Sequence, residues 1–237
     1  MSDYGLLIKN NSAEIQIDST YRNLSLDQSG SATIVNTYSS GEGVQTVSIT
    51  SSPLVPLILI RPDTDYYVGV RAYVKSGSNF TGFSVSSESI NPSSSTDIDW
   101  RCYRQNRTGS GESYGLLVYN SSGELCFDSG KSYFKVHSVH SIDLTAPANA
   151  EGTGDSEVIT HTAISNPFYI LSPNAYMITL VQQAPPMYKL GWWTIGIKKV
   201  SSTSVRVGWY QFRNRIAGSG TFAEGVNPTM KLLVCEP

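Results

Sequence analysis

The stretch that decides the fold is "SYGLLVYNSSGELCFDSGKSYF" at residues 113–134, because the chain also contains a near copy of it, "DYGLLIKNNSAEIQIDSTYRNL", at residues 3–24. The two stretches align without a gap. The identical pairs are Tyr4/Tyr114, Gly5/Gly115, Leu6/Leu116, Leu7/Leu117, Asn10/Asn120, Ser12/Ser122, Glu14/Glu124, Asp18/Asp128 and Ser19/Ser129. A match this dense indicates an internal duplication.

Each copy has the pattern of a β-hairpin. Tyr114, Leu116 and Val118 are spaced two apart, so they share one face of a strand. Residues 120–123, Asn-Ser-Ser-Gly, suit a type I turn that ends in a left-handed glycine, whereas Ala13 in the first copy predicts a different turn. The aspartates that end both second strands favour side-chain bonds that stop the ladder. The residues that we expect to define the hairpins are Tyr4, Gly5, Asp18, Tyr114, Gly115, Gly123 and Asp128.

A hairpin alone is only marginally stable, so each copy should open a larger unit. Three later pairs of segments recur in the same order: 51–62 with 165–173, 93–104 with 201–212, and "GLLVYN" (115–120) with "KLLVCE" (231–236). The third pair predicts that strand 114–119 closes the first unit as well as opening the second. The segment after residue 60 has no counterpart that the sequence reveals.

The rest of the chain also predicts strands, because Val, Ile, Tyr, Trp and Thr alternate in short runs between Ser, Asn, Gly and Pro clusters. No segment has the 3.6-residue period of a helix. We therefore expect an all-β fold of two tandem, related antiparallel β-sandwich domains, 1–113 and 114–237, sharing or abutting at a hairpin near 114–128. The predicted strands are 4–9, 14–18, 31–36, 44–50, 56–61, 66–74, 79–84, 97–104, 114–119, 124–128, 133–142, 157–162, 167–171, 176–182, 193–200, 203–212 and 230–235.

The composition excludes several classes of function. Charged residues make up 15% of the 237 residues and the net charge is −2, so no basic stripe would drive nucleic-acid binding. No apolar run approaches the roughly 20 residues that a membrane-spanning helix needs. The polar start of the chain does not suggest a secretory leader. The three cysteines, Cys102, Cys126 and Cys235, are expected to be reduced and buried rather than paired in disulfides.

The pattern from Tyr114 to Ser129, Tyr-Gly-Leu-x-Val-x-Asn-x-x-Gly-x-Leu-x-Phe-Asp-Ser, resembles the opening hairpin of small virion proteins of tailed bacteriophages, which are encoded with tail-tip and tail-fibre genes. The Asn-Pro-Phe-Tyr segment at 166–169, the strand at 202–209 and the closing Leu-Leu-Val strand at 232–234 resemble the same family. The resemblance implies a β-sandwich at the distal end of a phage tail. It brings no catalytic residues.

The titratable residues do not form a recognisable catalytic or metal site. His137 and His140 are three apart on a predicted strand and so point to opposite faces. Asp97 and Asp99 are two residues apart and so share one face of a strand, and the same holds for Asp63 and Asp65. Paired carboxylates can serve glycoside hydrolysis or bind Ca²⁺. A role in stabilising turns explains these pairs more simply. We expect no cofactor, no metal and no enzymatic activity.

The aromatic residues are the strongest candidates for a binding surface. These candidates are adjacent in pairs or lie on strands rich in aromatic residues: Trp192, Trp193, Tyr210, Tyr66 and Tyr67. About half of such rings should face the core and half should face the solvent, because neighbouring side chains of a strand point to opposite faces. The exposed rings would cover a protein interface or stack on sugars, with Arg213 and Arg215 nearby. The interface is the preferred interpretation.

Three functions follow from these patterns. The first is a structural subunit of the virion, at the tail tip or beside a fibre, that assembles with other tail proteins and forms a homo-oligomer, preferably a trimer. It would be made in the host cytoplasm. The second is a receptor- or glycan-binding adhesin of the tail. The third, an enzyme such as a depolymerase, would need two carboxylates facing each other across a cleft.

Overall fold

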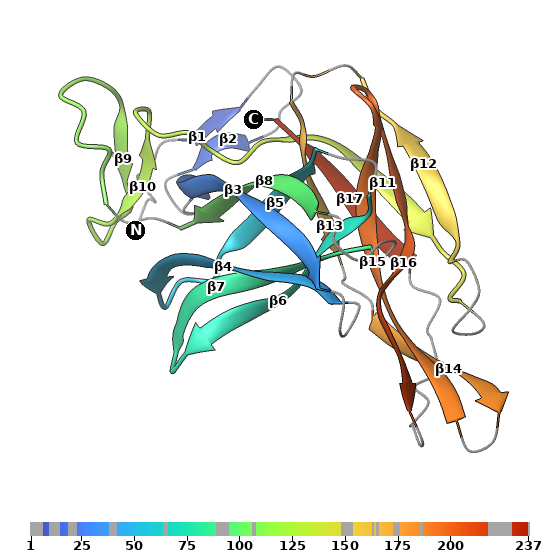
Figure 1. Ribbon diagram of the computed structural model, residues 1–237. Coiled ribbons are helices and arrows are strands. Elements are labelled where there is room, and N and C mark those ends of the chain that lie inside the picture. The colour runs from blue at the N-terminus through green and yellow to red at the C-terminus, as the bar shows by residue number, and fades with distance from the viewer. Residues whose placement is uncertain are drawn as a thin grey trace.

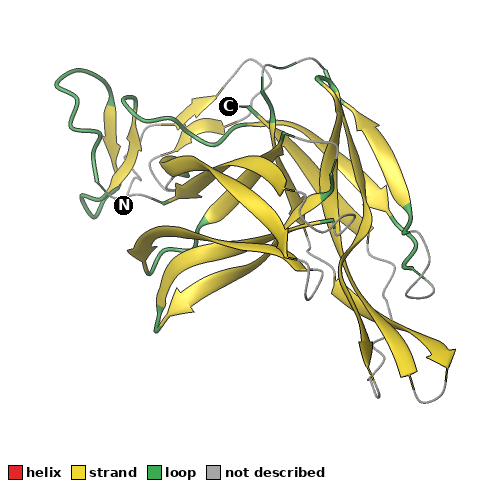
Figure 2. Ribbon diagram, in the orientation of Figure 1, coloured by secondary structure: helices red, strands yellow, loops and turns green. Residues whose placement is uncertain are grey.

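The computed structural model describes residues 7–9, 15–18, 23–37, 42–63, 66–88, 95–105, 108–147, 154–162, 164, 166–172, 176–184, 187–217 and 229–236. Every regular element in these residues is a β-strand, as Figure 2 shows. Tyr4 and Gly5 lie outside the described residues.

Seventeen strands are present in this part of the chain, and each overlaps a strand predicted from the sequence (Figure 1). Their bounds are β1 Leu7–Lys9, β2 Ile15–Asp18, β3 Ser25–Thr37, β4 Glu42–Ser52, β5 Leu57–Pro62, β6 Val68–Ser76, β7 Asn79–Ser87, β8 Ser95–Arg104, β9 Leu117–Tyr119, β10 Leu125–Asp128, β11 Val136–Asp143, β12 Ser156–Thr160, β13 Phe168–Ser172, β14 Tyr176–Ala184, β15 Met187–Ser201, β16 Ser204–Ala217 and β17 Thr229–Cys235.

Twelve of these strands form two antiparallel six-stranded sheets. Sheet 1 has the order β11-β17-β13-β5-β8-β3, and sheet 2 has the order β4-β7-β6-β15-β16-β12, with β14 also paired to β15. The sheets are connected where β3 pairs with β4 for two residues before the strands separate. Their facing sides share one apolar core, in which the rings of Phe83 from sheet 2 and Trp100 from sheet 1 meet edge to face at 5.5 Å. The expected all-β sandwich fold is confirmed.

The duplication extends through the whole body of the protein. Each half of the chain contributes three strands to each sheet. In sheet 1, the strands β3, β8 and β5 of the first half correspond to β11, β17 and β13 of the second half. In sheet 2, the strands β4, β7 and β6 of the first half correspond to β12, β16 and β15 of the second half. The order along the chain is the same in both halves, with β14 added in the second. Equivalent strands pair antiparallel at the middle of each sheet, which is the arrangement of an approximate two-fold axis.

Two details of the predicted repeat are corrected by the strand pairing. The strand predicted to close the first unit, 114–119, contains β9, which among the described strands pairs only with β10. The last strand of the first unit is instead β8, which lies between β3 and β5 in sheet 1. Because β8 pairs with both of these strands, no further strand can be inserted between them. The equivalent of β8 is consequently β17 and not the strand at 203–212. The domain limits 1–113 and 114–237 stay a prediction.

The segment after residue 60 also has a counterpart. It folds into β6 and β7, a hairpin with its turn at Gly77, and the equivalent hairpin is β15–β16 with its turn at residues 202–203. The sequences of these two hairpins differ, but their places in sheet 2 are the same.

The two halves meet edge to edge at a joint that consists of β5 with β13 and β6 with β15. Each strand pair has one registered residue pair, Ile60 with Tyr169 and Val68 with Ile197. Glycines allow the close approach of β6 and β15: a Cβ atom at Gly69 would lie 2.8 Å from the Ile195 carbonyl oxygen, closer than real Cβ atoms come. A side chain therefore does not fit between these strands.

Tyr210 of β16 lies across the glycines of this joint. Its ring borders Gly196 and its hydroxyl borders Gly69. That hydroxyl donates to the Ser86 carbonyl oxygen on β7 at 2.9 Å and lies 2.7 Å from the Ser86 hydroxyl. A side chain of the second half is thus hydrogen-bonded to a strand of the first half, and the ring occupies the space that the glycines leave open.

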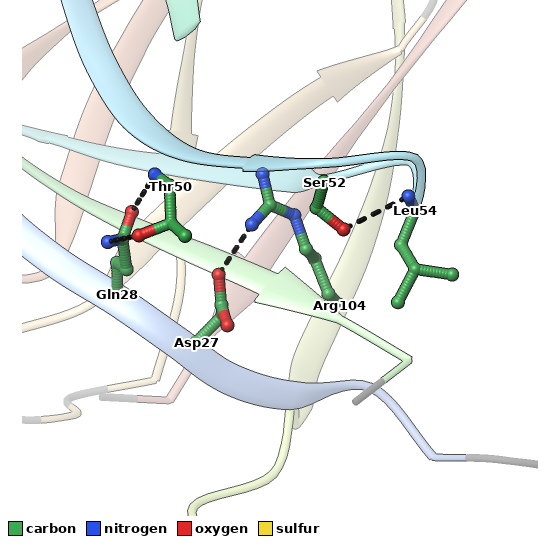
Figure 3. Close-up of polar contacts among 6 residues, drawn as sticks. All are labelled: Asp27, Gln28, Thr50, Ser52, Leu54 and Arg104. Atoms are coloured by element: carbon green, nitrogen blue, oxygen red, sulfur yellow. Dashed lines mark hydrogen bonds and ion pairs between the residues drawn. The ribbon is translucent and has the colours of Figure 1, made fainter. Parts of the chain in front are cut away.

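Polar side chains connect β3 and β4 where the two strands have moved into different sheets (Figure 3). Gln28 accepts from the Thr50 amide at 2.9 Å and donates to the Thr50 hydroxyl. Nearby, the buried Arg104 of β8 forms an ion pair with Asp27 at 2.7 Å. The Gln28–Thr50 hydrogen bonds thus connect β3 and β4 where these strands no longer share a backbone ladder, while the Arg104–Asp27 pair links β8 to β3 within sheet 1.

Replacing Gly196 with alanine tests the joint. A Cβ atom there would overlap the Val68 carbonyl oxygen and the Tyr210 ring, and backbone atoms cannot move aside cheaply. We expect a loss of about 1–3 kcal/mol in the free energy of unfolding, measured by chemical denaturation. Gly109→Ala is the matched control, because its Cβ would meet no atom closer than 3.7 Å. Equal stability of the two variants would show that β6 and β15 are not held in close contact.

Candidate functional site

The duplicated hairpin residues hold the hairpin together. The Asn120 carboxamide oxygen accepts from the amides of Ser122 and Glu124 at 3.0 and 2.8 Å, and its nitrogen donates to the Glu124 carboxylate at 3.0 Å. The Ser129 hydroxyl accepts from the Leu116 amide at 2.8 Å. The expected left-handed glycine is Gly123, with φ of 74°. The repeated polar positions are therefore explained by local structure.

Gly115 and Asp128 complete this local structure. Gly115 has φ of 139° and lies against the Ser129 hydroxyl, so a side chain would be both strained and crowded. Asp128 ends β10 and its backbone pairs with Leu117 of β9. In the first copy, Asp18 ends β2 and its backbone pairs with Leu7 of β1, so the two aspartates have equivalent places.

The Asp128 carboxylate organises the loop before the hairpin. It is 2% exposed and accepts from the amides of Ser110 at 2.5 Å and Gly130 at 2.8 Å, and from the Ser110 hydroxyl at 3.1 Å. The hydrogen bonds from Ser110 and Gly130 lower the pKa of Asp128 from its ordinary value, despite the opposing effect of burial. Lys131 donates to the Thr108 carbonyl oxygen in the same loop. This carboxylate thus has a structural function.

The hairpin also exposes apolar side chains, which we call the hairpin surface. Its members and their exposed fractions are Tyr114 (93%), Leu116 (42%), Leu117 (48%) and Tyr119 (52%). Only Val118 of this run points inward, with 6% exposed. In Figure 1 the β9–β10 hairpin stands at one end of the molecule, away from the two sheets. A group of large exposed apolar side chains is a candidate contact surface.

The five aromatic residues predicted to form an interface are mostly buried. Trp193, Tyr210 and Tyr67 are 4%, 1% and 7% exposed and so belong to the core, while Tyr66 and Trp192 are half-buried. Tyr67 stacks on Tyr210 with ring centres 5.9 Å apart. Trp192 packs against this pair on the outer face of sheet 2. Tyr67 and Tyr210 are buried because they pack together across the joint between the halves.

The carboxylates of Asp97 and Asp99 bind side chains of neighbouring strands. Thr33 donates to Asp97 at 2.6 Å, Ser31 donates to Asp99 at 2.5 Å, and the Arg61 guanidinium forms an ion pair with Asp99. Partial burial would raise the pKa of Asp99, but the hydrogen bonds from Ser31 and Arg61 outweigh it and lower that pKa. These carboxylates bind strands of sheet 1 together.

The histidines and cysteines show no metal cluster. His140 contacts the Ser138 hydroxyl at 3.0 Å, and the part of the chain that the structure describes contains no group of three His, Cys, Asp or Glu side chains able to hold a metal ion. The three cysteines are buried and are not joined in disulfides, as expected from the sequence. Burial raises the pKa of the Cys102 and Cys235 thiols to about 11 and 12, so both stay protonated near neutral pH.

No family model, curated protein or solved structure matches this chain. Among the described residues, no helix is long and apolar enough to cross a membrane.

The hairpin surface was missed by the sequence analysis although a signal for it was present. A strand with one buried face needs an apolar residue at every second position, whereas residues 116–119 are Leu-Leu-Val-Tyr without interruption. The excess of apolar residues over what one face can bury indicates a second contact surface.

Changing Asp128 to alanine tests its structural function. Loss of three hydrogen bonds should open the loop, and we expect the Ser110 and Gly130 amides to exchange with solvent faster, by about tenfold or 1–2 kcal/mol. Hydrogen exchange of the full chain measures this. Asp143→Ala, which removes an exposed carboxylate that accepts no such bonds from the described residues, should leave both amides unchanged.

The same experiment has a pH dependence. Because the pKa of folded Asp128 is lowered, its stabilisation is complete above the ordinary carboxyl pKa of about 4 and is lost as the pH falls through the lowered value. Wild-type protection of the two amides, corrected for intrinsic exchange, should therefore fall at acid pH, and the Asp128→Ala variant should lack that step. An identical acid step in both proteins would contradict this assignment.

Proposed function

We propose that this chain is a structural subunit of the distal tail of a bacteriophage, at the tail tip or beside a fibre, and that it acts by protein–protein assembly. The resemblance of Tyr114–Ser129 to the hairpin of phage tail proteins suggests the location. The observation that carries the proposal is the hairpin surface, because its apolar side chains are left exposed by the part of the chain that the structure describes.

The backbone of the hairpin supports an assembly function as well. Strand β9 pairs with β10 on one side, and none of the described strands pairs with its other side. An open strand edge beside Leu117 and Tyr119 can accept a strand from another protein, which gives backbone hydrogen bonds and apolar contact together. The partner that we propose is a neighbouring subunit of the tail.

The low charge and the two-fold repeat fit such a subunit. A chain in which only 15% of the residues are charged is suited to burial against other proteins. Tail tips are built around rotation axes, and for that reason we propose a homo-oligomer, preferably a trimer, in contact with other tail-tip or fibre proteins. The protein would be made in the host cytoplasm and reside in the virion.

The double variant Leu117→Ser/Tyr119→Ser tests the hairpin surface. Both side chains are about half exposed, so the variant should fold and keep the wild-type thermal midpoint. When it is supplied in trans to a phage that lacks the gene, we expect it to be missing from purified tails, as measured by mass spectrometry. Val55→Ser, which removes an apolar side chain that is 66% exposed and lies elsewhere, should be incorporated like the wild type.

Two results would contradict the proposal. Incorporation of the double variant at the wild-type level would exclude the hairpin surface as the contact. Absence of the wild-type protein from purified virions would exclude the tail location. If tails assemble without the protein and the purified protein binds host cells, the adhesin alternative would be favoured.

A further inference from the structure

A pocket of about 310 Å³ opens at the joint between the two halves of the chain. One wall is the end of β5 with the following Asp63, the second is formed by residues before β13 such as Pro167, and the third is the end of β15 with Lys199 and the turn into β16 with Ser202. The first wall belongs to the first half of the chain, and the other two belong to the second. The size is at the lower end of the range of about 300–1,000 Å³ for small-molecule sites.

Three polar groups of this pocket have no partner among the described residues: the Asp63 carboxylate, the Lys199 ammonium and the Ser202 hydroxyl. Asp63 and Lys199 do not form an ion pair with each other, so their charged atoms lie more than 4.0 Å apart. Other polar groups of the lining are already used. Arg61 is bound to Asp99, and the Tyr169 hydroxyl lies 3.0 Å from His161 Nε2.

The charges favour a neutral ligand. The two unpaired charges are opposite in sign, and the charge of Arg61 is already compensated by Asp99, so neither an anion nor a cation gains net attraction. A ligand that both donates and accepts hydrogen bonds can span the gap between Asp63 and Lys199. Hydroxyl groups do both.

Four apolar side chains lie among the polar groups of the pocket. Pro62, Ile164, Pro167 and Val205 line the same pocket. A pyranose ring combines hydroxyl groups around its rim with an apolar face of C–H groups, and this combination matches a pocket that offers polar groups and apolar side chains together.

We propose that this pocket binds one neutral pyranose unit of a glycan, with hydroxyl groups of the sugar donating to Asp63 and accepting from Lys199 and Ser202. The site lies at the joint, so the sugar contacts both halves of the chain. It is distinct from the aromatic residues that suggested sugar stacking in the sequence. This inference does not rest on the proposed tail function, because it concerns only the purified protein.

Saturation-transfer NMR of the full chain tests the proposal, with methyl glycosides of glucose, galactose and N-acetylglucosamine as neutral probes and glucuronate as the anionic probe. We expect at least one neutral sugar to bind at millimolar concentration. Asp63→Asn and Lys199→Ala should each weaken that binding by about tenfold or more, as expected for loss of a hydrogen bond to a charged group. Both side chains are exposed, so the thermal midpoint should stay unchanged.

Two matched controls lie outside the pocket. Asp143→Asn and Lys135→Ala change exposed side chains of the same types and should leave sugar binding unchanged. The proposal is overturned if no neutral sugar binds, or if binding survives both pocket substitutions. Binding of glucuronate alone, lost in Lys199→Ala, would also overturn it and would identify an anion site.

Discussion

The structure depends on the contact between β6 and β15, the strands at which the two halves of sheet 2 meet. Gly69 and Gly196 have no side chains to separate these strands, and Tyr210 fills the space above them and bonds to Ser86 of the other half. The equivalent contact of β5 with β13 joins sheet 1. Edge strands that would otherwise be open to water or to aggregation are thus covered by the related half. The single core, with Trp100 from one half and Trp193 from the other, follows from this joint.

The duplicated hairpin has a different relation to the body. In the second copy, the polar residues are explained by the turn and loop of the hairpin itself, while the apolar residues of the hairpin surface are left partly exposed. Under the proposed function, this hairpin is the element that attaches the protein to a neighbouring subunit. This arrangement suits a subunit that binds neighbours, and it leaves the joint between the halves as a separate place where a small ligand can enter.

Most of the fold could be predicted from the sequence, because strand positions follow from a local alternation of apolar and polar residues, and every predicted strand is present. The partners of the strands could not be predicted in the same way. The Leu-Leu-Val runs at 116–118 and 232–234 look alike, yet β9 lies in a separate hairpin and β17 lies in the core, since many strands satisfy the same alternation. Tyr210 was expected on a surface for a related reason: its burial depends on contact with Gly69 and Tyr67, which belong to the other half of the chain. The pocket with Asp63 and Lys199 could not be found before the halves were placed together.

The union of the two halves into one cooperative structure is best measured by scanning calorimetry of the full chain. If the joint and the common core hold the halves together, the protein will unfold in one transition, and the calorimetric and van't Hoff enthalpies will agree. Two separate transitions, each with about half of the total enthalpy, would show that the halves are independent sandwiches placed in tandem and would contradict the structure described for the joint.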